Sequence, residues 1–123
     1  MPNIVERKAI DMVMEFERQE GRNPKEIKLG GYDIKSGNRC IEVKGSSDNN
    51  IPSFIWINRT ILKKLGKDVI NYYIYIVYDI KRKPKLLILP SDLIFSNLEI
   101  DPFLLLYPNR IKKSNTELKI IDI

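Results

Sequence analysis

Residues 31–45 read Gly-Tyr-Asp-Ile-Lys-Ser-Gly-Asn-Arg-Cys-Ile-Glu-Val-Lys-Gly, which is the pattern of a β-hairpin. Two short runs of strand-forming residues, 31–35 and 39–44, flank a polar turn. Gly37-Asn38 is a favourable two-residue hairpin turn, because both residue types tolerate the positive φ that such turns need. The sequence therefore predicts two antiparallel strands joined at Gly37-Asn38.

The register of this hairpin decides which side chains lie together. With Gly-Asn as the turn, Asp33 lies directly opposite Glu42. Side chains alternate between the two faces of a strand, so Glu42 and Lys44 share one face. Ile41 and Val43 then project from the other face. The register predicts a cluster of two carboxylates and a lysine on one face of the hairpin.

This cluster has a definite chemistry. Opposed side chains in a hairpin have Cβ atoms about 4.5–5.5 Å apart, and two carboxylates that close repel unless a cation lies between them or one is protonated. Mg²⁺ takes oxygen ligands, usually one or two carboxylates with waters and phosphate oxygens. We therefore expect Asp33 and Glu42 to bind Mg²⁺ or Mn²⁺, with the backbone carbonyl of Val43 as a further ligand. Lys44 would orient the attacking water or stabilise developing charge, which predicts hydrolysis of DNA phosphodiester bonds.

An amphipathic helix precedes the hairpin. Apolar residues recur at intervals of three and four from Ile4 to Gln19, and Gly21 and Pro24 end the pattern. Glu17 lies beside the apolar stripe, so we expect it to point towards the sheet and to join the site. Glu6 shares this edge of the helix and is a reserve candidate.

The remaining sequence continues as an α/β pattern. The expected elements are a strand at 54–57, a helix capped by Asn58 and ending near Gly66, a central strand at 72–80 and a strand at 85–89. Pro90-Ser91 predicts a further helix with Ser91 as its N-cap, and the runs 103–107 and 117–123 are either late strands or a surface for a partner. The order α-β-β-β-α-β with a β/α extension predicts a mixed sheet flanked by helices.

The composition limits the class of protein. The 123 residues suit one domain, 1–123, and 43% apolar with 30% charged residues is a globular composition. A net charge of +5 favours polyanionic partners, and the basic groups at 63–67 and 81–85 are either phosphate contacts or a solvated face. One cysteine and no histidine exclude the usual zinc sites and histidine-dependent nucleophiles. Without a signal peptide or membrane segment, we expect a soluble cytoplasmic protein.

Three segments resemble a known family. They are Glu17-x₃-Gly21-Arg22-x-Pro24, Gly31-Tyr-Asp-Ile34 and Ile41-Glu-Val-Lys-Gly45, and they are similar to the NO VEIN C-terminal domain, a branch of the restriction-endonuclease-like PD-(D/E)XK superfamily. The resemblance runs from about Glu6 to Tyr78. It implies a restriction-endonuclease-like core with a helix, a three-stranded antiparallel meander, a second helix and a further strand. It also implies a nuclease site formed by Glu17, Asp33, Glu42 and Lys44.

One departure from the family leaves an alternative open. Relatives usually have a Thr and a Glu where the second helix begins, whereas this chain has Ile57-Asn58-Arg59-Thr60. The contribution of that Glu is absent here or replaced by Thr60. The alternative function is a non-catalytic nucleic-acid-binding or scaffold subunit, and the C-terminal apolar segment is a candidate contact for a homodimer or a protein partner.

Overall fold

The computed structural model describes residues 3–28, 30–57, 59–100, 104–111 and 120–123. In chain order the elements are α1 (Ile4–Gln19), β1 (Pro24–Glu26), β2 (Ile34–Ser36), β3 (Arg39–Gly45), β4 (Ile55–Ile57), α2 (Arg59–Leu65), the 3-10 helix η1 (Gly66–Asn71), β5 (Tyr72–Tyr78), β6 (Lys85–Pro90), α3 (Ser91–Ser96), β7 (Leu98–Ile100), β8 (Leu104–Leu106), α4 (Pro108–Ile111) and β9 (Ile120–Asp122). The predicted α/β class with a mixed sheet and flanking helices is confirmed.

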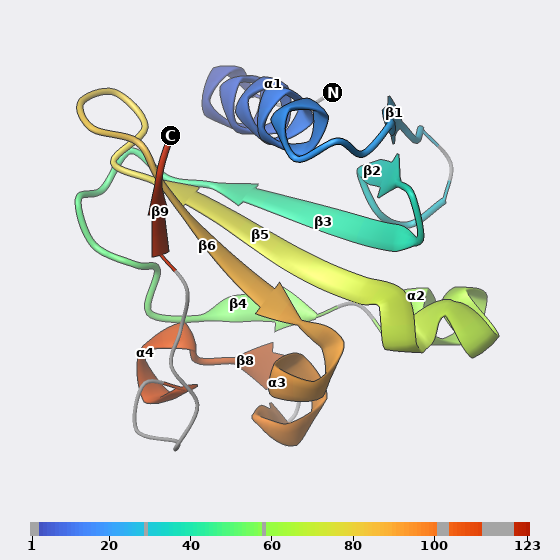
Figure 1. The fold of residues 1–123 in the computed structure, drawn as a ribbon. Coiled ribbons are helices and arrows are strands. Elements are labelled where there is room, and N and C mark those ends of the chain that lie inside the picture. The colour runs from blue at the N-terminus through green and yellow to red at the C-terminus, as the bar shows by residue number, and fades with distance from the viewer. Residues whose placement is uncertain (1–2, 29, 58, 101–103, 112–119) are drawn as a thin grey trace.

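A six-stranded mixed sheet forms the middle of the described structure, with the strand order β1-β2-β3-β5-β6-β9. Helix α1 covers one face of this sheet (Figure 1). A three-stranded sheet of order β4-β8-β7 lies on the other side, together with shorter helices (Figure 1). Each face of the six-stranded sheet therefore borders its own hydrophobic core.

Helix α1 spans the range that the amphipathic pattern predicts. Asn3 caps it, because its side-chain oxygen accepts a hydrogen bond from the Glu6 amide at 2.8 Å. Ala9 and Val13 are fully buried and belong to the core between the helix and the sheet. The periodicity of the sequence thus correctly predicts both the length of the helix and the face that it buries.

The hairpin has the register that a Gly37-Asn38 turn dictates: Ser36 pairs with Arg39, and Ile34 with Ile41. Gly37 adopts a φ of 57°, which glycine reaches without steric cost. The first strand is shorter than predicted, however, since β2 begins at Ile34. The residue before it, at position 33, is still fixed by its backbone, because its amide donates to the Ile41 carbonyl at 2.9 Å.

The meander on this side of the sheet is β1-β2-β3, with both pairs antiparallel. Sequence reasoning did not predict β1, a three-residue edge strand that starts at Pro24, a position where an edge strand tolerates proline. The strand predicted at 54–57 does form as β4, but it pairs with β8 in the second sheet. Ile55 and Ile57 are buried while Trp56 is 55% exposed, which suits a sheet with one covered face.

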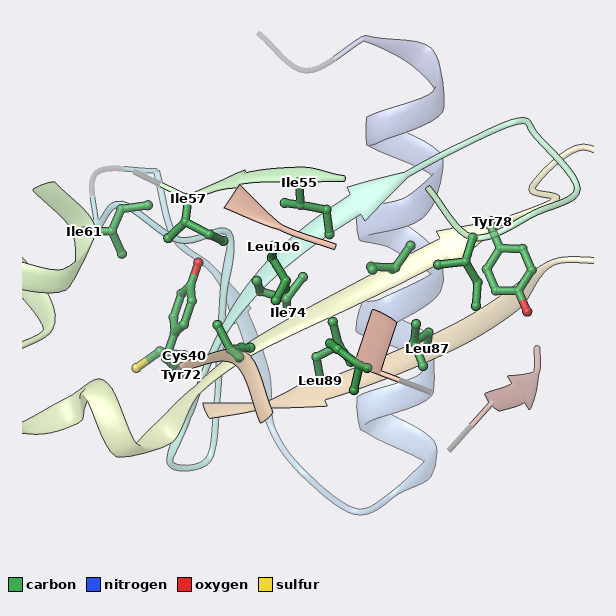
Figure 2. Close-up of a cluster of buried hydrophobic side chains, with 14 of the residues drawn as sticks. Cys40, Ile55, Ile57, Ile61, Tyr72, Ile74, Tyr78, Leu87, Leu89 and Leu106 are labelled. Carbon is green, nitrogen blue, oxygen red and sulfur yellow. The ribbon is translucent and has the colours of Figure 1, made fainter. Parts of the chain in front are cut away.

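Strand β5 is central, as predicted, because it pairs in parallel with β3 and antiparallel with β6. Tyr75 and Val77 belong to the core beneath α1, whereas the alternate residues Ile74 and Ile76 belong to the core on the side of the second sheet. Figure 2 shows this second core, which contains Ile74 from the middle sheet and Leu106 from β8. Leu106 is fully buried there, so this part of the predicted C-terminal apolar segment packs within the molecule.

The later elements correct some details of the prediction. Helix α3 begins at Ser91, but its N-cap is Pro90, and the Ser91 hydroxyl instead donates a hydrogen bond to the Ile70 carbonyl at 2.7 Å. The predicted Ser91 cap is therefore wrong. The predicted cap Asn58 lies outside the described residues. No helix in the described part of the chain is both long enough and apolar enough to cross a membrane.

The contact between α1 and β3 at Gly45 yields the first prediction. A Cβ at Gly45 would lie 2.9 Å from the Ala9 Cβ and 3.1 Å from the Val5 carbonyl oxygen. Because both belong to the packed helix, we expect Gly45→Ala to destabilise the protein by about 1–3 kcal/mol. Urea denaturation measures the change, with Ser47→Ala in the neighbouring exposed loop as the control. Equal stability of the two variants would contradict this close packing.

Candidate functional site

Asp33 and Glu42 lie together where β2 begins beside β3. The Asp33 carboxylate accepts a hydrogen bond from the Val43 amide at 2.8 Å. Asp33 also acts on Glu42: its negative charge, and its place as a hydrogen-bond partner for a protonated Glu42, both raise the pKa of Glu42. The Glu42 side chain is only 16% exposed. The structure therefore brings together the two carboxyl groups that the hairpin register predicts to be neighbours.

The electrostatics of this pair follow from its burial. Burial raises the pKa of Glu42 to about 9, and the hydrogen bond and negative charge of Asp33 act in the same direction. Lys44 opposes the shift without cancelling it. Tyr72, which is buried at the start of β5, has its pKa raised by burial and then by the charges of Glu42 and Asp33. The pair therefore holds a proton at neutral pH when no cation is bound.

Lys44 projects from β3 on the same side as Glu42. Its Nζ is 3.9 Å from Glu42 Oε1, and its side chain is 38% exposed. This distance is at the outer limit of an ion pair and too long for a hydrogen bond. The ammonium group is thus held near the carboxyl pair but keeps its hydrogen-bonding capacity for a water or a phosphate oxygen.

Glu6, the reserve candidate, joins this group from the first turn of α1. Burial raises the pKa of Glu6, while the charge of Lys44 lowers it and that of Asp33 raises it. The Gly45 amide, a hydrogen-bond donor close to the Glu6 carboxylate, lowers the pKa slightly. A glycine at this position allows the helix to approach β3 closely enough for that contact. The structure therefore places Glu6 beside Asp33, Glu42 and Lys44.

Glu17 lies elsewhere. It is 11 residues after Glu6 (17 − 6), which corresponds to about 16 Å along the helix axis. Its fully buried carboxylate accepts hydrogen bonds from Arg22 Nη2 at 2.8 Å, from Arg22 Nε, and from the Tyr75 hydroxyl at 2.9 Å. Burial alone would raise the pKa of Glu17, but these hydrogen bonds outweigh it and lower the pKa. Its described partners do not include Asp33 or Glu42, so the structure separates Glu17 from the predicted site.

The comparison with protein families bears on the same region. The model of the family described as protein NO VEIN, C-terminal, matches residues 5–89. The chain belongs to this family. The match begins at the start of α1 and ends within β6, so all residues of the site lie inside the family domain. Comparisons with curated proteins and with solved structures found no match.

The donor set in this NO VEIN C-terminal domain fits a hard cation. Among the described residues, no group of three or more His, Cys, Asp or Glu side chains is arranged to hold a metal ion. Asp33 and Glu42 supply two carboxylates, which is a usual protein contribution to a Mg²⁺ site. The Val43 carbonyl points to the same edge as its amide, because both groups of a strand residue face one neighbour. Mg²⁺ or Mn²⁺ could replace the proton of this pair.

Glu17 and Glu6 are expected to differ in their contribution to stability. Glu17→Gln removes the charge that Arg22 needs in a buried setting, so we expect a loss of about 2–3 kcal/mol. Glu6→Gln removes a carboxylate whose pKa is already raised, so its loss should stay below about 1 kcal/mol. Urea denaturation of the two variants measures both values. A larger loss for Glu6→Gln would contradict these assignments.

The metal-free protein should become less stable as pH rises. The folded pKa of Glu42, about 9, lies above its ordinary value of 4.5, so the stabilising proton is fully present below pH 4.5 and lost as pH rises towards 9. In EDTA at pH 8, Glu42→Gln should therefore be more stable than the wild type by at least about 1 kcal/mol, the value of one pKa unit. Thermal unfolding across this pH range tests the sign.

The control for this experiment is Asp92→Asn, which alters an exposed carboxylate in the first turn of α3. It should leave the pH profile of the wild type unchanged. If the stability of the wild type stayed constant or rose with pH over this window, the pKa of Glu42 would not be raised in the metal-free fold. A Glu42→Gln variant less stable than the wild type at pH 8 would lead to the same conclusion.

Proposed function

We propose that the chain is a Mg²⁺- or Mn²⁺-dependent endonuclease of the PD-(D/E)XK superfamily that hydrolyses DNA phosphodiester bonds. The observation that carries the proposal is the partly buried Asp33–Glu42 carboxyl pair, with Lys44 beside it near the end of β3. Membership of the NO VEIN C-terminal family is shown, whereas the superfamily and the activity are part of the proposal.

Each residue of the site has a role that its contacts support. Asp33, Glu42 and the Val43 carbonyl would hold the cation, which when bound lowers the pKa of a water and neutralises phosphate charge. Lys44 would donate hydrogen bonds to the attacking water or to a phosphate oxygen. Glu6, which lies close to Lys44 and to the Gly45 amide, would orient the Lys44 ammonium and accept a proton from the attacking water.

The charge of the chain agrees with a polyanionic substrate. It carries 21 Lys and Arg against 16 Asp and Glu, a net charge of +5. The alternative, a non-catalytic nucleic-acid-binding or scaffold subunit, draws on the exposed aromatic pair Phe54 and Trp56, which are 46% and 55% exposed and meet edge to face. That alternative predicts binding of nucleic acid or of a partner without any requirement for a divalent cation.

A cleavage assay separates the two functions. We expect plasmid, single-stranded or branched DNA to be cut with Mg²⁺ or Mn²⁺ and not in EDTA. Asp33→Asn, Glu42→Gln and Lys44→Met should each lower kcat about 100-fold or more, because each removes a group that acts in the transition state. Glu6→Gln should lower kcat as well, since its carboxylate contacts the Lys44 and Gly45 end of the site.

The matched control is Glu17→Gln, assayed at a temperature where circular dichroism shows that it is folded. It should retain activity, because its contacts are with Arg22 and Tyr75. Cleavage by Asp33→Asn at the wild-type rate would refute the endonuclease assignment. Calorimetry with Mn²⁺ alone adds an independent readout: the wild type should bind the ion and Asp33→Asn should bind it at least 10-fold more weakly.

A further inference from the structure

A groove of about 870 Å³ opens beside the carboxyl pair. Its walls come from the first turns of α1 and from the segment that runs from the end of β1 towards β2. Asp33 is one of its lining residues, so the groove borders the candidate site at this carboxyl group. Its remaining lining residues are Asn3, Ile4, Arg7, Lys8, Ile10, Glu26, Ile27 and Lys28.

One wall of the groove is held by a charged network. Arg7 Nη1 and Nη2 each donate a hydrogen bond of 2.8 Å to the Glu26 carboxylate, and Nη2 also donates to Asp11 at 2.9 Å. These bonds tie the edge strand β1 to α1. The guanidinium of Arg7 is therefore committed to protein carboxylates, and its role is to build the groove rather than to bind a ligand.

Two exposed lysines supply the available positive charge. Lys8 lies on α1 and Lys28 follows β1, and both line the groove. Neither makes an ion pair within 4.0 Å among the described residues. Ile4 adds an apolar surface beside them, being 77% exposed. The groove thus combines cationic side chains with apolar wall, which matches the phosphates and the sugars of a nucleic-acid strand.

The form of the groove favours a polymer over a compact anion. A small phosphate ligand needs buried, converging donors, but both lysines are exposed and Arg7 is already paired. The helix N-terminus is also occupied, since Asn3 caps the Glu6 amide. Long, mobile lysine side chains along an open groove instead contact successive phosphates of a backbone as point charges.

We propose that one strand of the nucleic-acid substrate lies in this groove, with backbone phosphates next to Lys8 and Lys28, and that the strand enters the site past Asp33. This inference rests on the proposed function and adds the path of the substrate to it. Lys8 and Lys28 are accordingly positioning residues: they hold the strand, while Asp33, Glu42 and Lys44 act on the scissile bond.

The test measures binding separately from cleavage. Fluorescence anisotropy with a labelled 20-nucleotide single strand is recorded in EDTA, where hydrolysis is stopped, over a range of NaCl concentrations. Lys8→Ala/Lys28→Ala should weaken binding about 5- to 20-fold near 0.1 M salt. It should also reduce the slope of log Kd against log[NaCl] by about 1.4, which is 0.7 for each of two phosphate contacts to a single strand.

The matched control is Lys81→Ala/Lys83→Ala, which removes the same charge from an exposed turn. This turn joins β5 to β6, beyond β3 in the strand order, and does not line the groove. It should change affinity less than 2-fold. In the cleavage assay, the Lys8/Lys28 variant should raise KM and leave kcat nearly unchanged.

The outcomes separate this inference from the proposed function. Unchanged binding by the Lys8/Lys28 variant, an equal loss in the control, or no binding by the wild type would each overturn the groove as the substrate path. Binding that depends on Lys8 and Lys28 in a protein that no divalent cation activates would support the path and refute the endonuclease. Cleavage that is indifferent to both lysines would support the endonuclease and refute the path.

Discussion

The hydrogen bond from the Val43 amide to the Asp33 carboxylate is the contact on which the site depends. Strand β2 begins only at Ile34. The acceptor for the Val43 amide is therefore the side chain of Asp33 and not a backbone carbonyl of β2. This hydrogen bond satisfies the Val43 amide beyond the end of the β2–β3 ladder and holds the Asp33 side chain beside β3. The Asp33 carboxyl group is thereby kept next to Glu42. A longer β2 would have satisfied the Val43 amide with a backbone carbonyl instead.

Helix α1 serves the site differently at its two ends. Its first turn approaches β3 at Gly45, where the missing side chain lets Glu6 reach the strand. Its last turns carry Glu17, which is buried in a network with Arg22 and Tyr75. The second contact fixes the direction of the helix across the sheet, because a buried carboxylate with two partners tolerates little displacement. The structural anchor at one end therefore determines which residues the other end presents to the site.

Local signals predicted most of the fold, and the errors have a common cause. The Gly37-Asn38 turn fixed the hairpin register, and helical periodicity fixed α1, because both depend on neighbours in sequence. Strand β1 was missed because its three residues become a strand only through pairing with β2. Glu17 was predicted for the site from helical phase together with the family resemblance, with Glu6 as the reserve candidate on the same edge of the helix. Phase alone cannot say which end of that edge lies near Asp33. The glycine that follows Lys44 was the sequence signal for that choice.

Glu42 and Lys44 lie two residues apart on β3, and their contact differs from a stabilising surface ion pair. A stabilising ion pair lowers the pKa of its carboxylate, whereas the pKa of Glu42 is raised to about 9. The Lys44 ammonium is 3.9 Å away, too far to compensate for burial next to a second carboxylate. In the metal-free fold this arrangement costs stability. Strongly shifted pKa values are concentrated at functional sites. Under the proposed function, a divalent cation held by Asp33 and Glu42 would remove the repulsion between the two carboxylates and supply the Lewis acid for hydrolysis.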